Sequence, residues 1–203
     1  MNLVKLKKFY KDKRVFITGH TGFKGSWLTA VLLKLGAKIT GYSLNDEKRK
    51  NYEKFINYKK LKNIYNDISN FKKLKKEIQK AKPQIIFHLA AQPLVADSYV
   101  RPLNTFNTNF VGSVNIFEIS RLLNIKSIVV ITSDKCYLNK EIKRGYKEID
   151  QLGGKDPYSA SKASVEIAFQ SYLHSFFNNK KNIGIATARA GNVIGGGDWS
   201  KDR

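Results

Sequence analysis

The sequence is short of cysteine, proline and acidic side chains, and it has no long hydrophobic run. Its 203 residues include one cysteine and four prolines. The lone thiol, Cys136, excludes an internal disulfide and with it a disulfide-stapled secreted scaffold. No run from Met1 onward has the length and apolarity of a signal peptide or a membrane span. We therefore expect a cytoplasmic protein without a membrane partner.

Acidic residues are outnumbered: 16 aspartates and glutamates face 37 lysines and arginines, a formal charge of +21. Such an excess favours nucleic acid or an anionic surface as a partner, because bound phosphate releases counterions. The excess is mostly lysine, densest at residues 48–82, without the interleaved aromatic and arginine pattern of a single-strand platform. We interpret the lysines as solvated helix faces, and a basic nucleic-acid-binding face stays open as the alternative.

Short apolar runs alternate with helical patterns, which predicts a parallel sheet. The expected strands are residues 15–18, 38–42, 84–88, 127–132 and 183–187, with a short extra strand at 63–65. The expected helices are residues 26–35, 47–57, 71–80, 105–123 and 158–177. Right-handed crossovers make this a doubly wound, Rossmann-type α/β fold in one domain. The connections at 91–104 and 135–157 are candidate binding loops.

A glycine turn, residues 18–25 (TGHTGFKG), joins the first expected strand to the first expected helix. Gly19 can supply the tight turn, Gly22 lets backbone approach a pyrophosphate, and Gly25 permits close packing of the helix on the strand. The helix N-terminus then faces the negative charge. This order indicates a dinucleotide cradle, while an ordinary strand-to-helix turn is the alternative for the glycines taken alone.

A tyrosine and a lysine four residues apart, Tyr158 and Lys162, begin the last expected helix. Four-residue spacing puts both side chains on one helix face. The ammonium favours the phenolate and brings the tyrosine pKa toward the range of a general base. Taken alone, the two residues also fit an ordinary surface pair.

A third set of polar residues, Ser133, Asp134 and Lys135, follows the strand expected at 127–132. Ligands of open α/β sheets bind beyond the carboxyl ends of the strands. Ser133 can hydrogen-bond a sugar hydroxyl, and Asp134 and Lys135 offer a proton donor and a proton acceptor. The alternative is a polar turn that caps the strand, with Asp134 pointing into solvent.

Together these residues resemble the extended short-chain dehydrogenase/reductase family and, within it, the CDP-glucose 4,6-dehydratases. The resemblance covers nearly the whole chain after Lys13. It is carried by residues 19–27 (GHTGFKGSW), 88–95 (HLAAQPLV), 133–137 (SDKCY), 156–159 (DPYS) and 189–199 (RAGNVIGGGDW). The Ser-Asp-Lys run is its most specific part. Dehydratases of dTDP-glucose usually carry Asp-Glu at the second and third positions, and epimerases lack the acid/base pair.

The resemblance implies conversion of CDP-glucose to CDP-4-keto-6-deoxyglucose in nucleotide-sugar (3,6-dideoxyhexose and O-antigen) biosynthesis. Tyr158 takes the proton of the sugar 4-hydroxyl as hydride leaves C4 for NAD. Ser133 shares that hydrogen bond, and Lys162 holds the phenolate and the nicotinamide ribose. Lys135 then removes the C5 proton, Asp134 protonates the departing 6-hydroxyl, and hydride returns to C6. Lys135 has to be neutral to act as a base, which requires burial or a neighbouring positive charge.

The implied cofactor contacts come from four segments. They are Gly19, Gly22, Phe23, Lys24 and Gly25 in the turn, Asp67 and Ile68 at the adenine, Ala90 and Ala91 along the cofactor, and Tyr158 and Lys162 at the ribose. Asn109 matches a structural asparagine of the family. The strand ending near Ser43 lacks the acid that selects NAD through the ribose 2′-hydroxyl. NAD therefore rests on the resemblance, and Ser43, Lys48 and Arg49 leave NADP open. No residue is assigned to a metal.

Family members continue well past residue 199 into a domain that holds the nucleotide and covers the sugar. We therefore expect residues 1–203 to form the NAD-binding Rossmann domain with the substrate domain absent, and we do not expect this chain alone to turn over at the rate of intact enzymes. The resemblance also implies a homodimer through helices 105–123 and 158–177. The alternatives are an epimerase or reductase acting on another nucleotide sugar, and a non-catalytic module that binds dinucleotide or nucleic acid.

Overall fold

The computed structural model describes residues 2–45, 61–178 and 182–198. Six parallel strands form one sheet in the order β3-β2-β1-β4-β5-β6. The strands are β1 (Arg14–Thr18), β2 (Lys38–Ser43), β3 (Leu61–Tyr65), β4 (Ile85–His88), β5 (Ser127–Ser133) and β6 (Gly184–Ala190). The strand order reverses on the two sides of β1, as in the Rossmann-type doubly wound fold. The predicted fold is confirmed.

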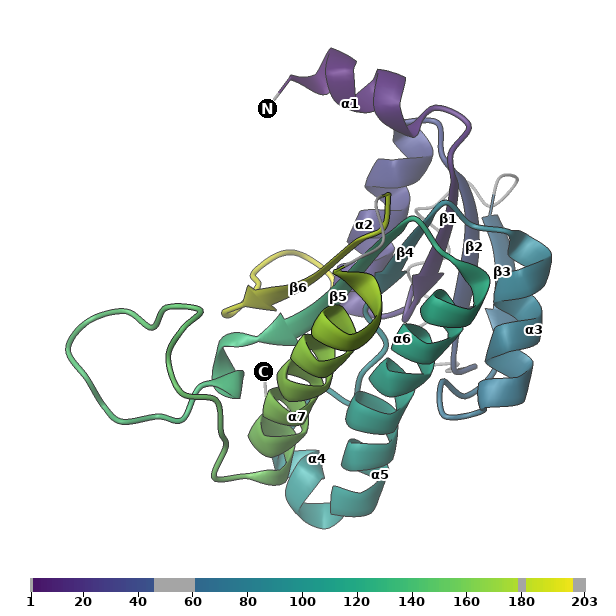
Figure 1. Cartoon of the computed structure of the whole chain (residues 1–203). Helices are drawn as coiled ribbons and strands as arrows, with labels where there is room; N and C mark the ends of the chain where they lie inside the picture. The colour runs from purple at the N-terminus through teal and green to yellow at the C-terminus, as the bar shows by residue number, and fades with distance from the viewer. Residues whose placement is uncertain (1, 46–60, 179–181, 199–203) are drawn as a thin grey trace.

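Helices cover both faces of the sheet (Figure 1). On one face, α2 (Phe23–Lys34) packs against β1 and β2. On the other, α3 (Phe71–Ala81), α6 (Gly112–Leu123) and α7 (Pro157–Tyr172) lie side by side. Cover on both faces is what a parallel sheet of apolar strands requires.

The core is split by the sheet into two layers, and β1 shows how the sequence produces them. Val15 and Ile17 point to one side, into a cluster that contains Leu32 of α2. Phe16 points to the other side, into a cluster that contains Ile116 of α6. All three β1 side chains are at most 1% exposed. Successive strand residues face opposite sides, so a continuous apolar run serves both layers.

An N-terminal helix, α1 (Leu3–Tyr10), was not expected from the sequence. Asn2 caps it by accepting a hydrogen bond from the N–H of Val4 at 3.0 Å. Leu6 and Tyr10 pack against the cluster beneath α2, while α1 itself projects from the end of the sheet (Figure 1). Eight residues, little more than two turns, give too short a pattern to predict a helix from periodicity.

The helix predicted at 105–123 is three segments in the structure. They are α5 (Pro102–Phe106), a π turn (Asn107–Val111) and α6. The helix predicted at 158–177 is likewise α7 followed by a π turn (Leu173–Phe177). The connection predicted at 91–104 also contains a short helix, α4 (Val95–Val100). The helix predicted at 47–57 lies outside the described residues.

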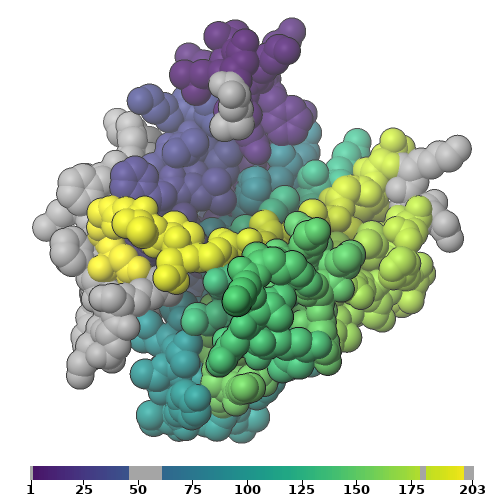
Figure 2. Space-filling view, turned by 90° about the vertical axis from the view of Figure 1, so that its left-hand side faces the viewer, coloured from purple at the N-terminus to yellow at the C-terminus, as the bar shows by residue number. Residues whose placement is uncertain are grey.

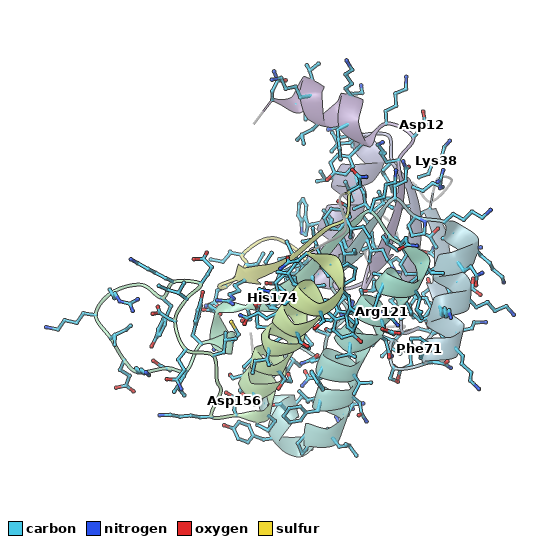
Figure 3. All side chains as sticks on the ribbon, viewed as in Figure 1. Asp12, Lys38, Phe71, Arg121, Asp156 and His174 are labelled. Carbon is cyan, nitrogen blue, oxygen red and sulfur yellow. The ribbon has the colours of Figure 1, made fainter. Side chains whose placement is uncertain are left out.

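A long connection between β5 and α7 loops away from the body of the molecule (Figure 1). It begins with a single 3₁₀ turn, η4 (Asp134–Cys136), and is pinned by one bridge between Tyr137 and Leu152. It ends at Asp156, which caps α7 and is labelled at the start of that helix in Figure 3. The candidate loop predicted at 135–157 therefore occupies the carboxyl end of β5.

Candidate functional site

At two glycines of the turn between β1 and α2, neighbouring backbone lies so close that a Cβ does not fit. Gly19 adopts φ +70°, and its N–H donates to the carbonyl of Tyr42 at 2.8 Å. A Cβ at Gly19 would lie 2.7 Å from the amide nitrogen of Ala90. A Cβ at Gly25 would lie 2.0 Å from the carbonyl oxygen of Gly19. Glycine is therefore required at both positions.

Helix α2 begins at this turn, so its N-terminus lies at the glycine backbone. Gly22 is the N-cap residue and contributes no side-chain cap. The first N–H groups of α2 therefore keep their capacity to bind an anion. A concave glycine backbone at a helix N-terminus fits a dinucleotide diphosphate. The structure thus brings together Gly19, Gly22, Gly25 and Ala90, four of the residues predicted to hold the cofactor, and Ala91 follows directly.

The segment after β6 crosses the same end of α2, as the yellow band over the blue helix in Figure 2 shows. Trp27 Nε1 donates to the carbonyl of Gly196 at 3.0 Å. A Cβ at Gly195 would lie 3.3 Å from the ring of Phe23. Phe23, a predicted cofactor residue, therefore lies between the glycine turn and the glycine-rich segment that follows β6.

The predicted adenine residues lie after β3 and are well ordered by local bonds. Asp67 Oδ1 accepts hydrogen bonds from the N–H and the hydroxyl of Ser69, each at 2.8 Å, and its carbonyl accepts one from the Tyr42 hydroxyl at 3.0 Å. Ile68 is 5% exposed, and its carbonyl accepts a bond from Asn115 Nδ2 at 3.1 Å. These bonds fix the segment, and the adenine contact stays a prediction.

The end of β2 carries a hydroxyl pair where a cofactor-selecting acid would stand. Thr21 Oγ1 donates to Ser43 Oγ at 3.1 Å, and Ser43 Oγ donates to the carbonyl of Leu44 at 3.3 Å. Lys48 and Arg49 lie outside the described residues. The pair puts no negative charge at this position, as the sequence indicated.

The predicted acid and base lie on η4, directly after β5. Ser133 Oγ donates to Asp134 Oδ1 at 2.9 Å and accepts from the N–H of Lys135 at 3.2 Å. Ser133 is buried, whereas Asp134 and Lys135 are exposed. Ser133 therefore organises the turn from below, and the two ionisable side chains point away from the core. Lys135 thus lacks the burial that was one of the two conditions for a neutral base at this position.

The predicted tyrosine and lysine lie on the buried face of α7. Tyr158 is 8% exposed and Lys162 is 5% exposed. Lys162 Nζ donates to the carbonyl of Ile131 at 3.5 Å, and α7 packs against η4. Burial and, to a lesser degree, the charge of Lys24 lower the pKa of Lys162 to about 8, and the charge of Glu166 opposes both effects. Lys24 and Lys162, both predicted cofactor residues, are thus electrostatically coupled.

A cavity of about 1150 Å³ opens beside this site, between α7, β6 and the long connection. Asp134 and Lys135 line it, together with Asp156 and Ser159 from the start of α7. Tyr158 and Lys162 do not line it. The structure therefore places the predicted acid and base at the edge of the cavity and the tyrosine and lysine beside it.

A chain of buried polar groups links the glycine turn to α6. His88 Nδ1 and Thr18 Oγ1 lie 2.6 Å apart, and His88 Nε2 and Ser113 Oγ lie 3.0 Å apart. Thr18 Oγ1 also accepts from the N–H of Ala90 at 3.2 Å. Burial and, to a lesser degree, the charge of Lys162 lower the pKa of His88 to about 3. A neutral imidazole here positions backbone and exchanges no protons near neutral pH.

Asn109 connects the segment after β4 to α7. Its Oδ1 accepts from the N–H of Gln92 at 2.8 Å, and its Nδ2 donates to the carbonyl of Gln92 at 3.1 Å and to Ser161 Oγ at 2.9 Å. The residue is fully buried and lies in the π turn before α6. It therefore has the structural role that the resemblance implied.

Glu166 is a buried acid that the sequence reasoning did not single out. It is 1% exposed and lies one helical turn after Lys162 on α7. Its carboxylate pairs with Arg189 Nη2 at 2.9 Å. The sequence did contain an indication of Glu166, because an acid four residues after a predicted site lysine lies on the same helix face.

The described residues contain neither a metal-binding cluster nor a membrane-spanning helix. No group of three or more His, Cys, Asp or Glu side chains in residues 2–45, 61–178 and 182–198 lies close enough to hold a metal ion. In the same ranges, no helix has the length and apolarity needed to cross a membrane.

The strand order, the glycine turn and the tyrosine and lysine on α7 define a Rossmann-type protein of the short-chain dehydrogenase/reductase class. Within that class, the chain belongs to the family described as GDP-mannose 4,6 dehydratase, whose sequence model matches residues 16–190.

Several of the relatives that the chain resembles are nucleotide-sugar enzymes. The chain is 47% identical over 203 residues to the CDP-glucose 4,6-dehydratase of Salmonella typhimurium, covering 97% of this chain and 56% of that protein. A UDP-N-acetylglucosamine 4-epimerase from Methanobrevibacter ruminantium, solved with UDP-N-acetylmuramic acid, has a TM-score of 0.74 at 26% identity over 88% of this chain and 55% of that one. A dTDP-glucose 4,6-dehydratase from Bacillus anthracis, solved with NAD, has a TM-score of 0.70 at 22% identity over 86% and 54% of the chains. The chain spans little more than half the length of these relatives.

Proposed function

We propose that this chain supplies the NAD-binding and acid/base part of a dehydratase that converts CDP-glucose to CDP-4-keto-6-deoxyglucose. One observation carries the proposal: Asp134 and Lys135 follow β5 on a turn that packs against α7, the helix of Tyr158 and Lys162, and both line the large cavity. An acid and a base side by side favour elimination of water over epimerisation. The relative from Salmonella typhimurium supports CDP-glucose as the substrate.

The residues of the glycine turn fit NAD as cofactor. Backbone at Gly19, Gly22 and Gly25 accommodates the diphosphate, and the N-terminus of α2 faces it. Lys24 adds a positive charge on the first turn of that helix. NAD held by these residues would supply a reversible hydride acceptor for C4 and hydride donor for C6 of the sugar.

The proposed steps at the sugar assign one proton to each side chain. Tyr158, as the phenolate held by Lys162, takes the proton of the 4-hydroxyl, and Ser133 shares that hydrogen bond. The C4 ketone acidifies the C5 proton, which Lys135 removes. Asp134 protonates the departing 6-hydroxyl, so that water leaves across C5 and C6. Lys135 then returns its proton to C5 as hydride adds at C6, and the sugar has lost one water overall.

Calorimetric titration of the purified chain tests the cofactor half of the proposal. We expect saturable heat with NAD and a further heat when CDP-glucose is added to the NAD-loaded chain. Gly22→Asp places a carboxylate at the N-terminus of α2, where it repels a diphosphate, and should abolish the heat with NAD. Gly145→Asp, in the long connection with nothing within 4 Å of its Cβ, is the matched control.

The same titration distinguishes the alternatives. Heat with NADP but not with NAD would contradict the cofactor assignment and would assign the hydroxyl pair of Thr21 and Ser43 to a 2′-phosphate. Heat with neither dinucleotide, from a chain whose circular dichroism shows it folded, would contradict the proposal as a whole. Salt-sensitive binding to an oligonucleotide in that second case would favour the nucleic-acid-binding module.

We further propose that two copies of the chain pair through α5 and α7. These helices contact one another and expose Leu103 (73%) and Ile167 (58%), with Val111 (38%) on the π turn between α5 and α6. Exposed apolar side chains on adjacent helices form a surface that a two-fold related copy can cover. The interface implied by the resemblance was helices 105–123 and 158–177, so this surface shares α7 and Val111 with it, whereas Leu103 lies just ahead of the implied range.

A further inference from the structure

The carboxylate of Glu166, on α7, accepts hydrogen bonds from three side chains of β5 and β6. Thr132 of β5 donates to Oε1. Thr187 and Arg189 of β6 donate to Oε2 at 3.0 and 2.9 Å. An ionised carboxyl group that is 1% exposed is costly unless it is paired and hydrogen-bonded. Four protein groups, including Glu166 itself, are committed to this one arrangement.

The guanidinium of Arg189 connects this buried pair to the turn that carries Asp134 and Lys135. It lies over the ring of Tyr137, 4.9 Å from the ring centre, and its Nη1 donates to the carbonyl of Glu148 at 3.2 Å. Tyr137 is the residue directly after η4. A planar guanidinium that pairs on one edge and stacks on one face holds its partners in a fixed direction.

The same carboxylate also lies behind the other site residues. Thr132 directly precedes Ser133, and Lys162 lies one helical turn from Glu166 on α7. The turn η4 packs against both α7 and β6. Every residue assigned to the chemistry at the sugar therefore lies on β5, η4 or α7, the elements that the pair formed by Glu166 and Arg189 connects.

We propose that Glu166 and Arg189 are positioning residues that hold η4 against α7, so that Asp134 and Lys135 face the same sugar as Tyr158 and Lys162. Only the purpose of holding the turn, which is to place an acid and a base at the sugar, rests on the proposed function. Proton transfer on both sides of one C–C bond needs the acid and the base placed to within a fraction of an ångström. The pair acts through Tyr137, and both of its side chains also line the cavity beside Asp134 and Lys135.

A variant at Arg189 separates positioning from plain stabilisation. Arg189→Lys keeps the charge beside Glu166 but loses the planar stack on Tyr137. Arg121→Lys is the matched control, because Arg121 also pairs with a glutamate, Glu118 at 2.6 Å, and lies 5.1 Å from the ring centre of Phe176. Tyr137→Leu is a second variant that leaves the buried ion pair intact.

Amide hydrogen exchange of the whole chain is the first measurement. In Arg189→Lys and in Tyr137→Leu, exchange of the amides of residues 134–137 should rise about tenfold, while residues 19–25 of the glycine turn exchange as in the wild type. Arg121→Lys should leave both segments unchanged. Unchanged exchange at 134–137 in both variants, or an equal rise in both segments, would overturn the proposal.

The second measurement uses turnover of CDP-glucose by the wild-type protein. Arg189→Lys should then lower kcat about tenfold with little change in KM or in NAD affinity, because only the placement of the acid and base changes. A rise in KM with kcat intact would overturn the positioning role. If the wild type binds NAD but does not dehydrate the sugar, the proposed function fails while the exchange experiment still decides whether the pair holds the turn.

Discussion

Single residues of the glycine turn are fixed by van der Waals contact with other backbone. The position of Gly25 is the clearest, since its absent Cβ would lie 2.0 Å from the Gly19 carbonyl oxygen. Helix propensity alone favours alanine over glycine by about 1 kcal/mol in a helix such as α2. Backbone cannot move aside as a side-chain tip can, so contact outweighs propensity at this position.

Gly25→Ala should therefore lower the free energy of unfolding by about 1–3 kcal/mol and weaken NAD binding. Urea unfolding followed by circular dichroism measures the first effect and calorimetry the second. Gly145→Ala, with open space around its Cβ, should stay within about 0.5 kcal/mol of the wild type. A Gly25→Ala variant as stable as the wild type would show that α2 can shift away from the turn.

Lys162 makes stability depend on pH in a direction opposite to that of a lysine in a salt bridge, whose pKa is raised on folding. Its pKa falls from 10.5 to about 8 on folding, so the unfolded chain binds the proton more tightly. The cost of burying the charge is fully present below about pH 8, declines as pH rises from 8 to 10.5, and is absent above that range. The direction follows because stability rises with pH wherever the unfolded state holds more protons.

Lys162→Met should accordingly be more stable than the wild type at neutral pH, and the difference should shrink by about 3 kcal/mol as pH rises through this window. Urea unfolding of both proteins at several pH values measures the difference. Lys72→Met, at an exposed position of α3, should show no such trend relative to the wild type. A difference independent of pH would mean that Lys162 is already neutral or that its charge is solvated.

Single side chains join helices and loops at this site, and Asn109 makes three such hydrogen bonds. It holds the backbone of Gln92 from both sides and reaches Ser161 on α7. Asn109→Ala should lower the free energy of unfolding by about 1–3 kcal/mol, because buried groups of the Gln92 backbone lose their partners. Thermal unfolding checks this against Asn107→Ala, an exposed asparagine of the same π turn. Equal effects of the two changes would contradict the role.

Strands were predicted from the sequence to within a few residues, because their apolar runs are short and clearly bounded. The extra strand at 63–65 is β3 (Leu61–Tyr65), and the long strand at 127–132 extends by one residue to Ser133. The order of the strands and the register of their pairing are not encoded in any local pattern. They follow from the fold class. The helix predicted at 105–123 missed its π turn, because that turn depends on bonds between Asn109 and residues far away in sequence.

The site was predicted unevenly for a similar reason. Motif residues such as Gly25 and Lys162 were identified because their spacing carries the chemistry. Glu166 and His88 were not, because their roles arise from burial and from partners on other strands. The cavity beside Asp134 depends on where the long connection folds, which no spacing in the sequence encodes.

At the scale of the whole molecule, the exposed apolar surface on α5 and α7 predicts the state of association. Leu103→Asp should raise the dissociation constant of a homodimer about tenfold or more, because it buries a charge at the interface. Sedimentation velocity over a dilution series measures it. Leu3→Asp, on the remote helix α1 and 69% exposed, is the control. A wild-type protein that sediments as a monomer throughout would contradict the dimer.

The strand order also determines how the sheet can assemble while the chain is being synthesised. Counting outward from β1, the chain adds β2 and β3 on one side and then β4, β5 and β6 on the other. No strand has to insert between two strands that have already paired. Each new strand pairs at an open edge of the sheet. The edge of β1 that later pairs with β4 remains unpaired while residues 19–84 are synthesised. Growth at two free edges lets the nascent domain add native pairs without undoing earlier ones.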